Sequence, residues 1–272
     1  MRAEMPSEPR TFVLRDRPTA AGAPRAEGHV GRRVVMGACL TAALGALARY
    51  TLSAGSAAPA ERRAAENVFQ AAREASRALA EGRLSPTTWQ ELVERAFRGA
   101  SVEEIARAID VESLLTRARA AARGAAVVPF ALSFPGGEGP RIVTKLFVLR
   151  AGRANPPHAH DNMVSMHYVL RGRFRVRHYD RVRDEPGGIV LRPTIDRILG
   201  PGEATSISDE RDNVHWHVAE TDGVLLDVLC VDLEGRPTDT HLLDPVRAEA
   251  LEGGLLRAPR LPTVGEALER FG

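Results

Sequence analysis

Histidines at alternate positions are the residues of this chain that are best suited to chemistry. His158 and His160 are separated by one residue in the segment PPHAHD, and His215 and His217 are separated by one residue in NVHWHV. Alternate residues of a strand point to the same side and lie roughly 6.5 to 7 Å apart, so both members of a pair can reach one ion. Neutral imidazole is a ligand of iron, zinc, copper and nickel. The spacing therefore predicts a metal site if the fold brings the two segments together.

Two further polar residues lie where buried strands are expected. Asp227 interrupts the apolar segment GVLLDVLCVDL, and a buried carboxylate without a partner is costly or becomes neutral, so it requires a partner or a role. His167 is two residues from Ser165 on the expected inward face, where it either approaches the site or is a hydrogen-bonded core histidine. His217 is either an alternative third ligand or a neighbour that orients a ligand or the substrate.

The elements that must position these residues are short strands. After residue 124, β-branched runs such as RIVTKLFVL, SMHYVLRG and RFRVRHYD alternate with breakers such as FPGGEGP, AGRANPP, DEPGG and LGPGE. This pattern predicts an antiparallel sandwich or small barrel over residues 125–247. In a barrel, the two histidine segments can face each other across the interior.

Helices are expected on both sides of this barrel. Residues 61–124 are rich in Ala, Glu, Leu and Arg, and the segments SPTTWQE and SVEE carry N-terminal capping patterns that begin at Ser85 and Ser101. Their apolar faces must be buried, either against the following domain or against a second copy of the chain in a homodimer. Residues 248–272 form a tail with a short helix.

Residues 1–60 resemble a twin-arginine-type export signal and leader. Arg32 and Arg33 precede an apolar run from Val34 to Ala48, and an A-x-A sequence ends at Ala60. The pattern predicts a periplasmic or exported protein whose contact with a membrane is limited to this segment. The alternatives are a misassigned start codon or a core-packed N-terminal helix in a cytoplasmic protein.

Composition excludes several classes of protein. The chain has 272 residues, 44% of them hydrophobic, which is enough for a buried core. Its net charge of +2 gives no electrostatic case for binding nucleic acid, and Lys145 is the only lysine among the 37 basic residues. Two cysteines do not define a disulfide framework.

The motifs resemble those of a known superfamily. G-x5-H-x-H from Gly152 to His160, continuing to Gly172, resembles the first motif of the cupins, which implies a mainly β fold, the double-stranded β-helix. Cupins usually have a Glu at the position of Ser165. Two segments resemble motifs of thiol dioxygenases of the cysteamine dioxygenase and plant cysteine oxidase kind. They are HAHDNMVSMHYVLRG, which includes Met163, and DNVHWHVAETDGVLLDVL. This resemblance covers roughly residues 125–245 and includes GRPTD at 235–239, although the family's tyrosine position is Leu233 here.

The resemblance implies a site and a reaction. Fe(II) is expected on His158, His160 and His215, with Asp227 as the active-site acid that holds an ammonium group of the substrate. The remaining residues expected near the ion or the substrate are Met163, Ser165, His167 and His217. Such a site oxidises a small thiol with O2 to the sulfinate.

Other assignments stay open at this point. The metal could instead be Zn, Mn or Ni. The protein could be a cupin dioxygenase or isomerase with a substrate other than a thiol. It could also be a non-catalytic cupin that senses a metal or ligand, with the helical segment binding a partner.

Overall fold

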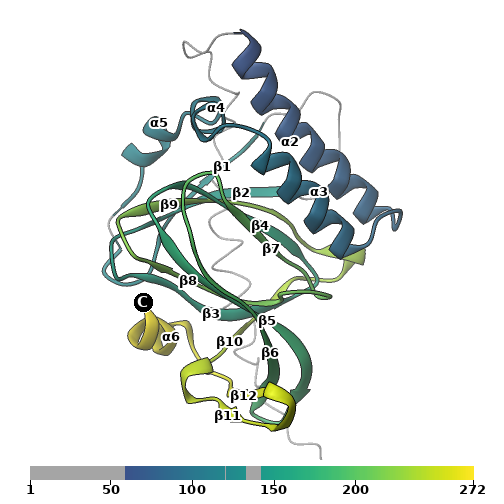
Figure 1. The fold of residues 1–272 in the computed structure, drawn as a ribbon, viewed down its shortest axis with the longest axis vertical. Helices are drawn as coiled ribbons and strands as arrows, with labels where there is room; N and C mark the ends of the chain where they lie inside the picture. The colour runs from purple at the N-terminus through teal and green to yellow at the C-terminus, as the bar shows by residue number, and fades with distance from the viewer. Residues whose placement is uncertain (1–58, 120, 133–141) are drawn as a thin grey trace, which may run out of the picture. The chain divides into compact units, whose positions relative to one another are not determined.

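The computed structural model describes residues 59–119, 121–132 and 142–272. Within these residues, a layer of helices comes first, two antiparallel sheets follow, and a short C-terminal helix comes last (Figure 1). The predicted signal residues Arg32 and Arg33 lie outside the described residues. In the part of the chain that is described, no helix has the length and apolar character needed to cross a membrane.

In the described part of the chain, four helices precede the sheets. The side chain of Ser85 accepts a hydrogen bond from the backbone of Thr88 at the start of the second of them, and Ser101 forms a capping box with Glu104 at the start of the third. Both predicted caps are therefore confirmed, and each satisfies N–H groups that would otherwise lack a partner. The helices are α2 (Pro59–Ala80), α3 (Pro86–Arg98), α4 (Val102–Ala108) and α5 (Val111–Thr116).

The strands form two sheets. Sheet A consists, in spatial order, of β1 (Ala126–Phe130), β2 (Ile142–Leu149), β9 (Gly223–Cys230), β4 (Val164–Arg171) and β7 (Ala204–Ile207). Sheet B consists of β10 (Asp239–Leu242), β3 (Ala154–Asp161), β8 (Val214–Ala219), β5 (Phe174–Glu185), β6 (Gly188–Leu199), β12 (Leu256–Pro259) and β11 (Glu249–Ala250).

The strand order defines the fold. The order β2-β9-β4-β7 in sheet A faces β3-β8-β5-β6 in sheet B, and every pairing is antiparallel. The chain therefore passes repeatedly from one sheet to the other, which is the double-sheet jelly-roll arrangement that cupins also have. The prediction of a mainly β, double-stranded β-helix preceded by a helical segment is confirmed.

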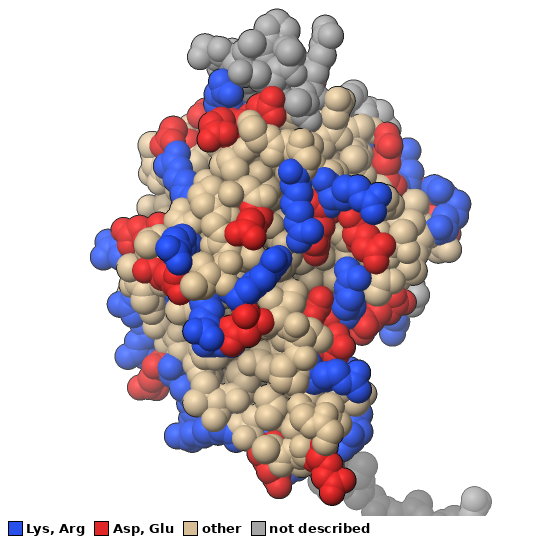
Figure 2. All heavy atoms as spheres, viewed as in Figure 1, with Lys and Arg blue, Asp and Glu red and all other residues tan. Residues whose placement is uncertain are grey.

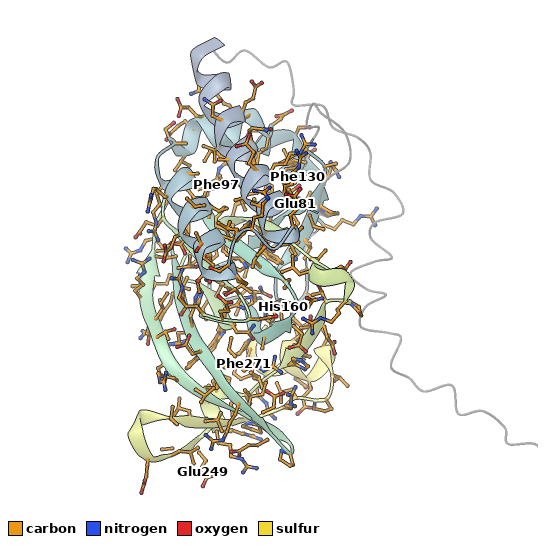
Figure 3. The ribbon with its side chains drawn as sticks, turned by 90° about the vertical axis from the view of Figure 1, so that its right-hand side faces the viewer. Glu81, Phe97, Phe130, His160, Glu249 and Phe271 are labelled. Atoms are coloured by element: carbon orange, nitrogen blue, oxygen red, sulfur yellow. The ribbon has the colours of Figure 1, made fainter. Side chains whose placement is uncertain are left out.

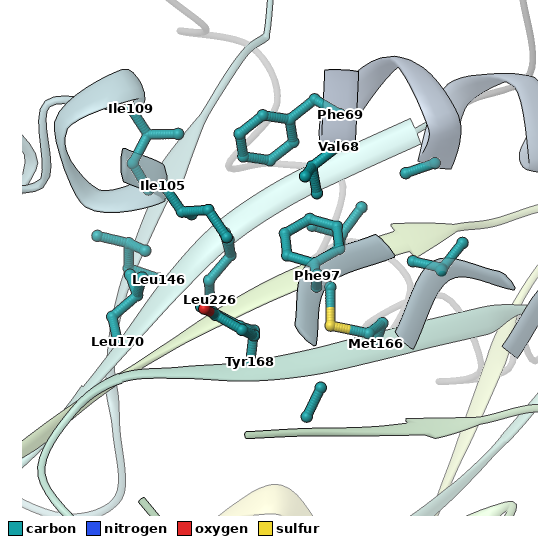
Figure 4. Packing of buried hydrophobic residues seen from close by; sticks show 14 of the residues in the cluster. Val68, Phe69, Phe97, Ile105, Ile109, Leu146, Met166, Tyr168, Leu170 and Leu226 are labelled. Carbon is teal, nitrogen blue, oxygen red and sulfur yellow. The ribbon is translucent and has the colours of Figure 1, made fainter. Parts of the chain in front are cut away.

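The helices cover the outer face of sheet A. Phe97 lies against Phe69 and Tyr168, with ring centroids 5.4 and 5.5 Å apart, and Met166 and Leu226 belong to the same buried cluster (Figure 4). Full burial of one such side chain contributes about 1.5–3 kcal/mol. The apolar helix faces predicted from the sequence are thus buried against the following domain within the same chain.

The interior between the two sheets is apolar at one end and polar around the buried histidines. The apolar end is closed by the turn between β4 and β5, where Gly172 has a φ of +79° and lies against the backbone of Asp222. Gly223 lies against the Phe174 ring in the same region. The buried cluster there contains Phe147, Leu149, Val169, Phe174, Val176, Leu199, Ala219 and Leu225.

The C-terminal segment extends sheet B and packs beside it. Strands β12 and β11 continue the sheet beyond β6, and β10 pairs with β3. Helix α6 (Val264–Phe271) lies against β3, where the rings of Phe271 and Trp216 are 5.2 Å apart. Three short 3-10 helices are η3 (Leu233–Gly235), η4 (Pro245–Arg247) and η5 (Glu252–Gly254).

Acidic and basic side chains alternate on the face shown in Figure 2. Among the surface ion pairs of the protein, Arg175 lies 2.7 Å from Asp196, and both side chains are about half exposed. Pairs of this kind contribute little to stability because water screens them. The charges that matter for chemistry lie inside the barrel.

Candidate metal centre

Three histidines from two neighbouring strands converge inside the barrel. His158 and His160 lie on β3, and His215 lies on β8 directly opposite His158 in the strand register. One ligand atom from each of the three lies within 4.8 Å of the others. His215 is 1% exposed, whereas His158 and His160 are partly exposed. In the view of Figure 3, His160 lies between Phe97 of the helical layer and Phe271 of α6.

Hydrogen bonds orient all three imidazole rings in the same way. In each ring, Nδ1 lies within hydrogen-bond distance of a backbone carbonyl oxygen, which can only accept. In His158 and His215, Nδ1 therefore carries the proton and Nε2 keeps a free lone pair. Nδ1 of His160 also lies 3.0 Å from Thr240 Oγ1, a hydroxyl that can donate or accept. Such outer partners fix the tautomer that a metal ion requires. The carbonyl oxygens are those of Pro156 at 2.7 Å from His158, Asp239 at 3.3 Å from His160, and Asn213 at 3.2 Å from His215.

The triad is neutral at physiological pH. Burial lowers the pKa of His158 to about 4, and it lowers the pKa values of His160 and His215 well below their usual range. For His160 and His215, the neighbouring His158 adds to this effect. Neutral imidazole is the form that binds metal, so these residues fit a divalent ion such as Fe, Zn or Ni. The donor set contains three nitrogens and no carboxylate.

A charged network lies on the opposite wall of the barrel. Lys145 on β2 and His167 on β4 are the two register neighbours of Asp227 on β9. Lys145 Nζ is 3.2 Å from Asp227 Oδ2, Ser165 Oγ donates to Oδ1, and His167 Nε2 is 3.8 Å from Oδ1. The partner that the sequence required for Asp227 is therefore Lys145, which occupies the position expected for a substrate ammonium.

Lys145 was not among the site residues predicted from the sequence. Two signals were present. Lys145 is the only lysine of the chain, and in the strand-like run RIVTKLFVL it alternates with the apolar residues Leu146 and Val148. Its side chain is 13% exposed and that of Asp227 is 3% exposed, so the two charges form a largely buried pair.

Three more buried histidines adjoin the triad. His167 connects the two walls, because its ring centroid is 5.1 Å from that of His215 and 4.5 Å from that of His217. His178 on β5 lies directly opposite His215 in the register, at 6.1 Å between rings. Burial lowers the pKa of His178 to about 3 and the pKa values of His167 and His217 well below the usual range. All three are neutral.

These three histidines have nitrogens that lack a hydrogen-bond partner among the described residues. The unpartnered atoms are both ring nitrogens of His178 and of His217, and Nδ1 of His167. An unsatisfied buried polar atom costs about 1–3 kcal/mol. The inner part of the site is therefore suited to water or to polar groups of a ligand, and His178 belongs to it although it was not predicted as a site residue.

Met163 lies at the side of this polar region. It is 3% exposed and packs in an apolar cluster with Ile207 and Leu229, which are the register neighbours of Ser165. The structure thus brings Ser165, His167 and His217 to the polar interior and places Met163 in an adjacent apolar wall.

A second group of residues has donor atoms close enough for a metal ion. Asp161, Asp239 and His241 form this group on β3 and β10. The Asp161 carboxylate, however, accepts from Arg181 and lies 2.7 Å from His241 Nε2. These bonds account for the group as a surface ion-pair cluster.

Comparison with known proteins gives similarity to solved structures alone. No family model matches the chain, and no curated protein matches it. TT1209 from Thermus thermophilus is 22% identical, with 44% of this chain and 93% of that chain covered and a TM-score of 0.32. KdgF from Halomonas sp. is 21% identical, with 39% and 78% covered and a TM-score of 0.29. An RmlC-like cupin from Shewanella frigidimarina NCIMB 400 is 17% identical, with 42% and 81% covered and a TM-score of 0.30.

Because these identities and TM-scores are low, the class of protein is assigned from the strand order and not from the similarity. The order of the eight central strands gives a cupin-type barrel, and its histidine triad has the geometry to hold one metal ion. A fold of this kind can carry many different activities, so the reaction follows from the residues of the site.

Proposed function

We propose that this protein is a mononuclear non-haem iron dioxygenase that oxidises a small thiol to the sulfinate. The observation that supports the proposal is the donor set of three neutral histidines with no carboxylate, His158, His160 and His215. The position at which cupins usually supply a glutamate is Ser165, whose hydroxyl donates to Asp227 instead. The resemblance of both motifs to thiol dioxygenases points in the same direction.

The chain's own residues determine how such a reaction proceeds. Fe(II) would be held by His158, His160 and His215, and it would lower the pKa of a coordinated thiol and supply the redox chemistry that O2 requires. Three neutral ligands leave the charge of the ion uncompensated, so they favour an anionic thiolate. The carbonyl groups bonded to Nδ1 hold the rings in place, and the Lys145–Asp227 pair supplies fixed charges on the facing wall. Both atoms of O2 are added to sulfur, which loses the electrons that O2 gains, and R–SH becomes R–SO2H.

Oxygen uptake tests the proposal directly. The full-length protein, loaded anaerobically with Fe(II), should consume O2 with at least one of cysteamine, cysteine, 3-mercaptopropionate or an N-terminal-cysteine peptide. Mass spectrometry should then show a product heavier by two oxygen atoms, both derived from labelled O2. The matched control is His215→Ala, which removes one ligand.

Four results would overturn the proposal. Absence of uptake with every thiol in iron-loaded protein would remove it. Turnover of a diketone or a catechol would instead select a cupin dioxygenase that cleaves carbon–carbon bonds, and isomerisation of a substrate without O2 would select a cupin isomerase. Tight zinc binding without an open coordination position would indicate a structural or sensing site.

A further inference from the structure

Lys145 has hydrogen-bonding capacity that the protein itself does not use. An ammonium group has three N–H donors. Among the described residues, the only partner within ion-pair or hydrogen-bond distance of Lys145 Nζ is the Asp227 carboxylate, at 3.2 Å. The same nitrogen lies 4.9 Å from the centre of the Phe147 ring. Donors therefore remain for a group that enters the barrel from outside.

The lysine lies within electrostatic range of the metal triad. His167 links the two walls, because Asp227 Oδ1 is 3.8 Å from its Nε2 and its ring centroid is 5.1 Å from that of His215. Burial is the main cause of the lowered pKa values of His158 and His160, and the Lys145 charge adds to it in both cases. The side chains that connect the triad with Lys145, those of His167 and Asp227, are thus polar.

Asp227 is poorly placed to bind a substrate ammonium. Its Oδ2 is paired with Lys145, and its Oδ1 accepts from Ser165. A substrate ammonium bound to Asp227 would therefore lie beside the Lys145 ammonium in a largely buried region. Like charges in such a region repel strongly.

Charge balance favours an anionic group on the substrate. Imidazoles that bind a metal ion are neutral and the Lys145–Asp227 pair cancels, so a divalent ion leaves two positive charges in the interior. A thiolate removes one of them, and a carboxylate on the same substrate removes the other. The ammonium group of an amino-thiol would instead add one positive charge, so two positive charges would remain. Uncompensated buried charge is strongly unfavourable.

We infer that Lys145 binds a carboxylate of the thiol substrate, so that the enzyme prefers mercapto acids to amino-thiols, and that Asp227 is a positioning residue for the lysine. This inference rests on the proposed function. It differs from the sequence-based expectation, in which Asp227 itself holds a substrate ammonium.

Because Lys145 is the only lysine, an amine-reactive reagent can report on it selectively. Full-length protein loaded with zinc should be labelled in the presence of 3-mercaptopropionate, cysteamine or ethanethiol, and peptide mapping separates Lys145 from the N-terminal amine. The labelling rate of Lys145 is taken relative to that of the N-terminal amine in the same sample, because cysteamine itself carries an amine that consumes the reagent. We expect 3-mercaptopropionate at saturation to slow the labelling of Lys145 at least tenfold, and the other two thiols to change it less than twofold. Equal protection by cysteamine and 3-mercaptopropionate would overturn the inference.

Thermal unfolding of the same zinc-loaded samples gives an independent measure of binding. The Tm should rise more with 3-mercaptopropionate than with cysteamine or ethanethiol, and Lys145→Met/Asp227→Asn should abolish that difference. The double variant contains no unpaired buried carboxylate, so it should not suffer the loss of stability that Lys145→Met alone would cause. A difference between ligands that persists in the double variant would refute a role for Lys145.

Kinetics with the iron-loaded protein complete the test. In Lys145→Met/Asp227→Asn, kcat/KM for 3-mercaptopropionate should fall at least tenfold more than kcat/KM for ethanethiol, whereas Lys145→Arg should retain most of the preference. Equal losses for both thiols would overturn the inference. If no thiol is oxidised but labelling remains selective, the proposed dioxygenase function fails while the carboxylate site stands.

Discussion

Removal of the Lys145 charge should destabilise the barrel through Asp227. At the observed separation of 3.2 Å, two unit charges attract each other by about 5 kcal/mol at an effective dielectric constant of about 20. Both groups lose hydration when they are buried, at a cost of several kcal/mol each, so the intact pair contributes little overall. Lys145→Met nevertheless leaves a 3% exposed carboxylate without its cation, which should lower the free energy of unfolding by about 3–5 kcal/mol.

A double-mutant cycle separates this effect from simple loss of packing. Asp227→Asn alone leaves the 13% exposed lysine without its anion and should cost about 1–3 kcal/mol. Because Lys145→Met/Asp227→Asn contains neither charge, its loss should be at least about 2 kcal/mol smaller than the sum of the two single losses. Urea unfolding of metal-free protein at pH 7, followed by far-UV circular dichroism, gives the four free energies at comparable m-values. Additivity within about 0.5 kcal/mol would refute the buried ion pair.

Three further predictions concern the triad, pH and a turn. His215→Ala should weaken Zn(II) binding more than about 100-fold, because loss of only a hydrogen-bond partner of a metal ligand already weakens metal binding 10–100-fold. Competition with a chelator measures the affinity, and retention of the wild-type affinity would exclude His215 as a ligand. The metal-free protein should lose stability as the pH falls from about 6.5 towards 4, by roughly 1.4 kcal/mol per pH unit for each histidine that gains its proton only on unfolding. This direction follows because burial lowers the pKa values in the folded state, to about 4 for His158 and about 3 for His178. His178→Phe should make the pH dependence of the free energy of unfolding shallower, as measured by urea unfolding. An unchanged slope would contradict this prediction. Gly172→Ala should cost at least about 2 kcal/mol, since the residue has a φ of +79° and a Cβ there would lie 2.4 Å from a backbone oxygen. The matched control Gly152→Ala, at a φ of +77° with open space around it, should cost about 1 kcal/mol, and equal losses in thermal unfolding would show that the close contact is unimportant.

Local patterns in the sequence were sufficient to predict the fold class. Alternating apolar residues bounded by Gly and Pro predicted the strands, and Ser85 and Ser101 marked the starts of two helices that the structure contains. These signals depend on nearest neighbours along the chain, so they can be recognised without knowledge of the tertiary structure.

One break in the pattern was misinterpreted. AGRANPP was predicted to be a break between strands, whereas β3 begins at Ala154 and continues through Pro156 and Pro157. The pairing of β3 with β8 shifts its register between Asn155 and His158, so the ladder does not need the N–H groups that proline lacks. The Pro157 carbonyl still accepts from Leu243.

The candidate site was predictable in part, for a reason that lies in the topology. His158 and His160 are neighbours on one strand, so their shared face follows from their spacing. Lys145 and Asp227 are far apart in the sequence and meet because β2 lies beside β9 in the jelly roll. The sequence could show that Asp227 needed a partner, but only the strand order identifies that partner.

Strands β4 and β9 have no side that faces water. Every residue of β9 is buried, and β4 alternates between the helix-covered residues Met166 and Tyr168 and the interior residues Ser165 and His167. Neutral substitutions therefore have almost no place to accumulate on these two strands, whereas exposed positions are frequent on β11 and in the second half of β6. A deep mutational scan should show this contrast as two intolerant stripes through the middle of the molecule and a permissive margin at the far end of sheet B.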